Sequence, residues 1–173
     1  MSNRPTVLEW LLVGIQLALF VFYFVSLTAV DAFFSDVLQI IGGVPMAVGA
    51  VFVIWALLQQ RLNLSIFPSP KEDGHLITTG VYKWVRHPIY AGILFVAFGY
   101  AIYVQSFYKI IIALLLLILF ELKSTYEERL LEAKFPAYGQ YKLNTGKFFP
   151  LQIRWRKEEV AFDIETTKDE NEA

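Results

Sequence analysis

A dense group of polar side chains stands directly before an uncharged apolar run in this sequence. Tyr82, Lys83, Arg86 and His87 precede the run, which begins at Pro88. Proline has no backbone N–H to donate, so it fits the first turn of a helix, where that donor would be unpaired. We therefore predict that Arg86 and His87 lie at the mouth of a helix that enters apolar surroundings. A positively charged membrane anchor with an aromatic belt is the plain alternative.

A second group of ionisable residues follows the last apolar run. Lys123 and Glu127 are four residues apart and are therefore neighbours on a helix surface, and Glu128 follows directly. A solvated helix face is the plain alternative for such an acidic pair. If both groups, together with Tyr90, lie at one membrane surface, their convergence indicates a functional site. Such a site offers cationic donors for a carboxylate, carboxylates for an ammonium or sulfonium, and aromatic faces for a cation. A zwitterionic sulfonium ligand, a nucleotide and a lipid headgroup all remain open.

Membrane-spanning helices are the elements that must position these groups. Hydrophobic residues make up 56% of the 173 residues, whereas ~45–50% is usual in soluble domains. The uncharged runs 10–30, 37–60 and 88–108 each reach the ~20 residues that cross a bilayer. The run 110–120 is shorter, but Lys109 can snorkel to one interface and the helix can continue on the other side. We expect an all-α integral membrane protein with spans at about 8–30, 38–59, 88–106 and 109–124.

The distribution of charge predicts the orientation of these spans. Of the 15 Lys and Arg residues, Lys109 alone falls in a segment that we expect outside. The positive-inside rule then places both termini in the cytoplasm, which requires an even number of spans. We therefore expect a multi-pass protein of a bacterial-type cytoplasmic membrane.

The chain is expected to form one transmembrane domain over residues 1–157, with an acidic, disordered tail over 158–173. The first two spans are interpreted as scaffold, because their polar residues, such as Gln16 and Gln60, are few. Small residues that would allow close helix packing in the second span are Gly42, Gly43, Gly49 and Ala50. The aromatic residues predicted to form an amphipathic interfacial element are Tyr138, Tyr141, Phe148 and Phe149.

Composition and motifs argue against several other classes of protein. Cysteine is absent, which excludes disulfides, thiolate chemistry and zinc–sulfur sites. His75 and His87 lie in one loop without a clustered carboxylate, so we expect no metal site. The basic residues lie close to apolar helices rather than on a separate basic domain, so we expect no nucleic-acid partner.

The C-terminal half of the sequence resembles a family of integral-membrane methyltransferases, which includes isoprenylcysteine carboxyl methyltransferases and phospholipid methyltransferases. Two ordered groups of motifs carry the resemblance, within residues 74–150. The first is Leu76 to Gly92 (LITTGVYKWVRHPIYAG). The second comprises Glu127 to Leu131 (EERLL), Phe135 to Tyr141 (FPAYGQY) and Thr145 to Pro150 (TGKFFP).

The resemblance implies S-adenosylmethionine as cofactor, in a cytosol-facing pocket between the loop before the third helix and the end of the fourth. It implies cofactor contacts for His75, Leu76, Ile77, Tyr82, Arg86, His87, Pro88, Tyr90 and Glu127. Among these, Tyr82, His87 and Tyr90 would meet the methionyl part, and Glu127 the ammonium or ribose region. Lys123 stands where relatives place an arginine facing the methyl acceptor, so it is expected to bind substrate.

The expected acceptor is a lipophilic molecule that enters from the bilayer, and membrane lipids are the other expected partners. Its reacting group remains open between carboxylate, amine, thiol and hydroxyl, and the oligomeric state is open too. An amine or hydroxyl acceptor needs a general base, for which Glu127 and Glu128 are the candidates.

Two other functions compete with methyl transfer. Sterol reductases, which use NADPH, have a related C-terminal cofactor region, but they are much longer, and an acidic residue typically follows their tyrosine–glycine pair. Here Ile93 follows Gly92. A non-catalytic membrane scaffold or transporter subunit is the second alternative, and the convergence of polar groups disfavours it.

Overall fold

The computed structural model describes residues 5–25, 36–60 and 75–150. Its helices are α1 (Val7–Phe24), α2 (Asp36–Gln59), the 3₁₀ turn η1 (Gly80–Lys83), α3 (Pro88–Tyr103), α4 (Phe107–Lys134) and α5 (Tyr138–Asn144). The described part of the chain is mostly helical and contains no strand. The predicted tail 158–173, the loop 31–35 and the end of the first predicted span lie outside the described residues.

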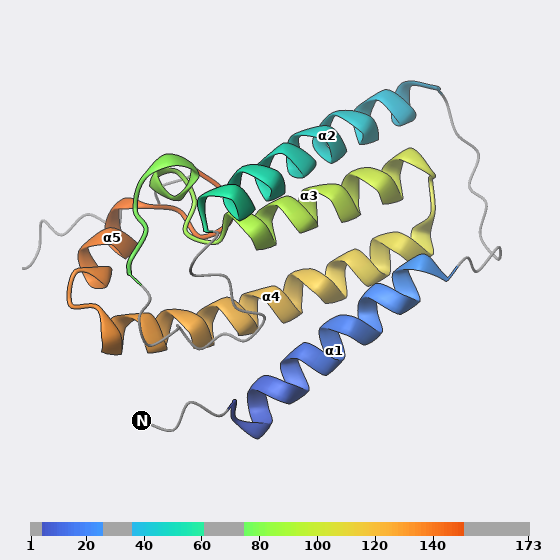
Figure 1. Cartoon of the computed structure of the whole chain (residues 1–173). Coiled ribbons are helices and arrows are strands. Elements are labelled where there is room, and N and C mark those ends of the chain that lie inside the picture. Colours follow the sequence, from blue (N-terminus) through green and yellow to red (C-terminus); the bar gives the residue numbers. More distant parts are fainter. Residues whose placement is uncertain (1–4, 26–35, 61–74, 151–173) are drawn as a thin grey trace, which may run out of the picture.

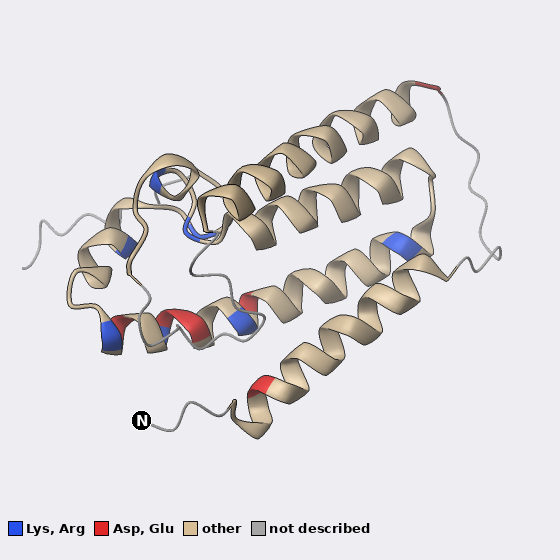
Figure 2. Ribbon diagram, in the orientation of Figure 1, with Lys and Arg blue, Asp and Glu red and all other residues tan. Residues whose placement is uncertain are grey.

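The long helices form two pairs that lie side by side (Figure 1). α2 packs along α3, and α1 packs along α4, while α3 and α4 join the two pairs. The short elements η1 and α5 lie together at the end of the bundle where α4 finishes. This end also gathers most of the charged residues that the structure describes (Figure 2).

Glycines bring α2 and α3 into backbone contact. A Cβ atom on Gly42 would lie 2.6 Å from the carbonyl oxygen of Gly99, and one on Gly49 would lie 2.6 Å from that of Gly92. A side chain at any of these positions would push the helices apart, which is the usual reason for small residues between membrane helices. The predicted role of Gly42 and Gly49 is confirmed, whereas a Cβ on Gly43 would meet only the Tyr103 side chain, at 3.9 Å.

Side chains from the start of α4 donate hydrogen bonds to carbonyl groups at the end of α1. The Tyr108 hydroxyl donates to the Phe22 carbonyl at 2.9 Å, and the Lys109 ammonium donates to the Tyr23 carbonyl at 2.6 Å. Helix-terminal carbonyls need such donors where water is scarce, and a cation suits the negative end of a helix. Lys109 therefore does not snorkel outward as expected: it is buried, with its ammonium 4.9 Å from the centre of the Tyr23 ring.

The four long helices correspond to the four predicted spans. By length and composition, α1 and α2 are apolar enough to cross a membrane, and α3 is a shorter apolar helix. The 16 residues of α3 give a length of ~24 Å, somewhat less than a hydrocarbon core of ~30 Å. α4 runs unbroken for 28 residues, so the helix does continue beyond Phe120, as predicted. The crossing of all four helices and the cytoplasmic position of the termini remain predictions.

Candidate functional site

The loop before α3 is fastened to the end of α2. The Gln59 side chain donates to the Thr79 carbonyl at 2.7 Å and accepts from the Val81 backbone N–H at 3.2 Å. Gly80, between these two residues, has a φ of 59°, and the Gln59 amide fills the space that a Cβ there would need. A glycine is required on both counts. This contact fixes the position of η1, from which the site residues follow.

The segment after α5 pairs with the backbone of the same loop. Arg86 N–H donates to the Gly146 carbonyl at 2.9 Å, and His87 N–H donates to the Lys147 carbonyl at 3.1 Å. Val85 and Gly146 form a parallel bridge. Pro88 then occupies the first turn of α3, as predicted, with His87 as the N-cap residue. The chain thus presents Arg86 and His87 from a backbone that is held on both sides.

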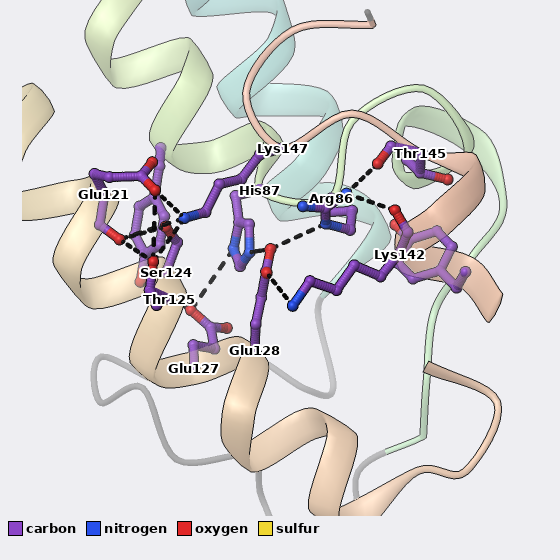
Figure 3. Close-up of polar contacts among 12 residues, drawn as sticks. Arg86, His87, Glu121, Ser124, Thr125, Glu127, Glu128, Lys142, Thr145 and Lys147 are labelled. Atoms are coloured by element: carbon purple, nitrogen blue, oxygen red, sulfur yellow. Dashed lines mark hydrogen bonds and ion pairs between the residues drawn. The ribbon is translucent and has the colours of Figure 1, made fainter. Parts of the chain in front are cut away.

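Arg86, His87, Glu127 and Glu128 form what we name the ionic cluster (Figure 3). Glu128 Oε1 lies 2.9 Å from Arg86 Nε and 3.1 Å from His87 Nε2, and Glu128 Oε2 lies 3.3 Å from Lys142 Nζ. Arg86 also donates to the carbonyl oxygens of Lys142 and Thr145. One carboxylate therefore ties the start of α3 to α4 and α5. A solvated face is wrong for Glu128, whose side chain is only 5% exposed.

The Glu128 carboxylate is stabilised in its charged form. Burial alone would raise the pKa of Glu128, but the hydrogen bond and charge of His87 and the charge of Arg86 outweigh burial and lower the pKa to about 2. Glu128 is therefore ionised at neutral pH, and both of its oxygens already face cationic groups. Such a carboxylate is poorly suited to accept a proton.

Glu127, the adjacent residue, has different surroundings. Its side chain is 25% exposed, and its Oε2 accepts from the Tyr90 hydroxyl at 3.2 Å and lies 3.8 Å from His87 Nδ1. Burial raises the pKa of Glu127, although His87, Tyr90 and Lys123 act in the opposite direction. Glu127 is thus more basic than an ordinary glutamate and partly accessible, which are the properties of a candidate base or cation ligand.

Aromatic rings pack beside the ionic cluster and Lys123. The Tyr90 ring stacks on His87 with centroids 5.6 Å apart and on Phe120 with centroids 4.7 Å apart. The Lys123 ammonium lies 5.6 Å from the Tyr90 ring centroid. It donates to Gln16 Oε1 of α1 at 2.7 Å, and Lys123 is only 2% exposed. The predicted substrate-binding cation is therefore buried beside the cluster and contacts a helix that the sequence analysis treated as scaffold.

Three tyrosines form the other side of the site. The Tyr82 hydroxyl donates to Gln60 Oε1 at 2.5 Å, and the Tyr141 hydroxyl donates to the Tyr82 carbonyl at 2.6 Å. Tyr138 is 1% exposed, and its hydroxyl has no hydrogen-bond partner within the described part of the chain. The prediction of an interfacial element is wrong for Tyr138, because α5 turns this ring into the interior.

The structure brings most of the predicted site residues together. Those gathered around the ionic cluster are Arg86, His87, Tyr90, Lys123, Glu127 and Glu128. Pro88 is buried at the start of α3, and Ile77 packs with Val81 and Tyr82. Leu76 is half-buried and His75 is exposed in the segment before η1. The cofactor contacts predicted for residues 75–77 remain predictions.

Several residues that support the site are not among those predicted from the sequence. Lys147 donates to Glu121 Oε1 at 2.5 Å and to the Thr125 hydroxyl at 2.8 Å, which fastens the last described segment to α4 (Figure 3). The signal for Gln16 was present, since an amide in an apolar helix needs a partner. Nothing in the sequence pattern indicated the part that Lys142 and Thr145 have in the cluster.

Two curated relatives resemble part of the chain. The cobalt-zinc-cadmium resistance protein CzcN of Cupriavidus metallidurans is 28% identical over 99 residues, which are 57% of this chain and 46% of the relative. The nickel-cobalt-cadmium resistance protein NccN of Alcaligenes xylosoxydans xylosoxydans is 29% identical over 114 residues, 65% of this chain and 53% of the relative. The chain thus spans about half the length of these relatives.

A family model covers the site itself. The phospholipid methyltransferase model matches residues 37–138, which include the whole ionic cluster and Lys123 and leave out α1. The match extends over more than half of the chain, and the apolar helices agree with a membrane protein. The chain belongs to the phospholipid methyltransferase family.

Proposed function

We propose that this protein transfers a methyl group from S-adenosylmethionine to a membrane-associated amphiphilic acceptor. The observation that carries the proposal is the position of Glu127, the member of the ionic cluster that remains partly exposed, beside Tyr90 and His87. Membership of the methyltransferase family supports the reaction class. The acceptor would enter from the bilayer, because the cluster lies at one end of apolar helices.

The chemistry of the donor set fits this cofactor. Its ammonium and sulfonium are cations, and the site offers the Glu127 carboxylate and the rings of Tyr90 and Tyr82. The buried Tyr138 hydroxyl, without a partner among the described residues, is a further polar group available to a ligand. When bound, the cofactor supplies a methyl group that the sulfonium has already activated.

The two glutamates would then have separate tasks. Glu128 holds His87 and Arg86 in place through its ion pairs. Glu127 would bind the cofactor's ammonium, or accept the proton that an amine or hydroxyl acceptor releases on methylation. A carboxylate or thiolate acceptor releases no proton and needs no base. In either case the main work of the protein is to position the two reactants and to exclude water.

Ligand binding to the purified full chain in lipid nanodiscs tests the proposal. We expect titration calorimetry to show binding of S-adenosylmethionine and none of NADPH. His87→Ala should weaken the binding by about ten- to a hundredfold, because it removes a group that orients Glu127. Arg129→Ala is the matched control, since Arg129 is exposed on the same helix.

Each other outcome contradicts the proposal in its own way. Binding of NADPH alone would favour a reductase, and binding of neither ligand would favour a scaffold. Unchanged affinity in His87→Ala would contradict the location of the site.

A further inference from the structure

The side chain of Lys147 fastens the last described segment to α4. Its ammonium donates to Glu121 Oε1 at 2.5 Å, to the Thr125 hydroxyl at 2.8 Å and to the Glu121 carbonyl at 3.4 Å. The Lys147 side chain is only 19% exposed, whereas that of Glu121 is 54% exposed. An ion pair with one partner at the surface contributes little to stability by itself. The effect of these bonds therefore lies in what they hold in place.

The backbone of the same residue binds the start of α3. The Lys147 carbonyl accepts from His87 N–H at 3.1 Å. The next ring along the chain, that of Phe148, packs on the His87 ring with centroids 6.2 Å apart. Lys147 therefore joins His87, on the α3 side of the ionic cluster, to α4 on the other side (Figure 3).

Lys147 binds α4 at a turn whose geometry depends on side chains. The hydroxyls of Ser124 and Thr125 both donate to the Glu121 carbonyl, at 3.1 and 2.7 Å. Hydroxyl groups that bond back to the preceding turn often bend a helix. Because the Thr125 hydroxyl also accepts from Lys147, the ammonium fixes the direction of that hydroxyl. Lys147 thus acts on the turn that precedes both glutamates of the ionic cluster.

α4 is held against the site at two points on one face. Glu121 and Thr125 bind Lys147, and Glu128 Oε1 lies 3.1 Å from His87 Nε2. Residues four and seven positions apart lie on the same face of a helix, and seven residues span ~10 Å. One point of attachment would leave α4 able to turn about it, whereas two points fix the rotation of the helix.

The rotation of α4 determines where Glu127 points. Glu127 Oε2 accepts from the Tyr90 hydroxyl at 3.2 Å and lies 3.8 Å from His87 Nδ1, beyond hydrogen-bond length. Glu127 is thus held less closely than Glu128. Because neighbouring helix positions point about 100° apart, a small rotation of α4 about the Glu128 contacts would move Glu127 away from His87.

We propose that Lys147 is a positioning residue, which holds α4 so that Glu127 faces His87 and Tyr90. This inference rests on the proposed function, which gives Glu127 its task at the cofactor's ammonium. It adds a residue beyond the range 37–138 that matches the family. A purely structural role of Lys147 would change stability and leave the contact between His87 and Glu127 as it is.

NMR of the histidine rings measures this contact without any ligand. The chain has two histidines, His75 and His87, so the full chain with nitrogen-15-labelled histidine in nanodiscs gives one set of ring signals for each. His75 is exposed and serves as the internal reference. Glu127→Gln calibrates the measurement, because it should shift the Nδ1 signal of His87 more than the Nε2 signal, which Glu128 holds.

Lys147→Met should shift the His87 Nδ1 signal in the same direction as Glu127→Gln. Lys147→Arg, which keeps the charge and the donors, should restore the wild-type signal. Glu121→Gln, an exposed change that removes the ion pair, should act like Lys147→Met and add nothing in its background. Lys83→Met is the matched control, because it removes an exposed cation from the same end of the bundle, and it should leave the signal unchanged.

Calorimetry on the same samples tests the consequence for the proposed site. Lys147→Met should bind S-adenosylmethionine about three- to tenfold more weakly than the wild-type protein, and Lys147→Arg should recover the affinity. Glu121→Gln gives the answer even if Lys147→Met does not fold, because the pair loses its charge while Lys147 remains.

The outcomes separate this inference from the proposed function. An Nδ1 signal that Glu127→Gln moves, but that neither Lys147→Met nor Glu121→Gln moves, would overturn the role of Lys147. An equal shift in Lys83→Met, or no shift in Glu127→Gln, would overturn it too. A protein that does not bind S-adenosylmethionine, but whose Nδ1 signal moves in Lys147→Met, would overturn the proposed function and leave the positioning by Lys147 standing.

Discussion

Glu127 and Glu128 are consecutive residues of α4 that both lie near His87, yet the pKa of one carboxyl is raised and that of the other is lowered. Glu128 faces the cationic groups of Arg86 and Lys142 as well as His87, and its pKa is lowered to about 2. Glu127 bonds Tyr90, remains 25% exposed and has a raised pKa. Because neighbouring helix positions point about 100° apart, one side chain enters the junction with α5 while the other turns toward α3. This division underlies the first two predictions.

Glu128 should make the stability of the protein depend on pH in the acidic range. Its folded pKa of about 2 is below the ordinary value of 4.5, so its stabilisation is present above pH 4.5 and is lost as the pH falls toward 2. The shift corresponds to about 3 kcal/mol. Thermal unfolding in detergent between pH 6 and pH 2.5 should show this loss in the wild-type protein.

The variant Glu128→Gln isolates this contribution. It should be less stable at pH 6, because Arg86 loses its counter-charge and Lys142 keeps only its ion pair with Glu132. Its stability should change less between pH 6 and 2.5. Glu132→Gln, which alters an exposed glutamate on the same helix, is the control. A pH dependence identical to that of the wild-type protein would show that Glu128 does not have a lowered pKa.

Glu127→Gln should affect ligand binding rather than folding. Its carboxylate has only Tyr90 and His87 as close polar contacts among the described residues, so we expect a small change in melting temperature. The affinity for S-adenosylmethionine should fall by about ten- to a hundredfold, because a charge-assisted bond to the ammonium is lost. Calorimetry and thermal unfolding on the same sample measure both effects. Full affinity in Glu127→Gln would remove Glu127 from the proposed site.

The sequence predicted the helices and the main site residues more closely than it predicted their supporting contacts. Apolar run length indicated α1, α2 and α3, because a membrane span requires about 20 such residues, whereas the shorter run of α4 indicated a span only together with the continuation of the helix. Pro88 and the charged residues before it indicated the start of α3, because proline lacks a backbone N–H and fits the first turn of a helix. By contrast, the contacts of Gln16, Lys109 and Tyr138 depend on which helices pack together. Sequence separations of 107 residues for Gln16 and Lys123 and 86 for Lys109 and Tyr23 carry no periodic signal.

The packing of α2 against α3 gives a prediction with an internal control. Gly92→Ala would place a Cβ 2.7 Å from the Gly49 carbonyl oxygen and 2.6 Å from Val53 Cγ2. We expect a loss of about 1–3 kcal/mol in stability, as for other overpacked interfaces. Gly43→Ala, whose Cβ would meet only the Tyr103 side chain at 3.9 Å, should be neutral or slightly stabilising. Thermal unfolding measures both effects. Equal losses of stability in Gly92→Ala and Gly43→Ala would contradict the close contact between α2 and α3.

The orientation in the membrane gives the last prediction, because the proposed reaction requires that cytosolic S-adenosylmethionine reach the site. Charged residues of the described chain gather at the end of the bundle that holds η1 and α5 (Figure 2). At the other end Lys109 is buried against Tyr23 and Tyr100 instead of facing the surroundings. The positive-inside rule therefore predicts that the ionic cluster lies at the cytoplasmic surface. Reporter fusions after Lys157 should be active only in the cytoplasm, and fusions after Ser35 only outside.

Because four spans require both termini on one side, a fusion after Asn3 should match the one after Lys157. An external reporter after Lys157 would place the ionic cluster on the side without S-adenosylmethionine and would contradict the proposed reaction.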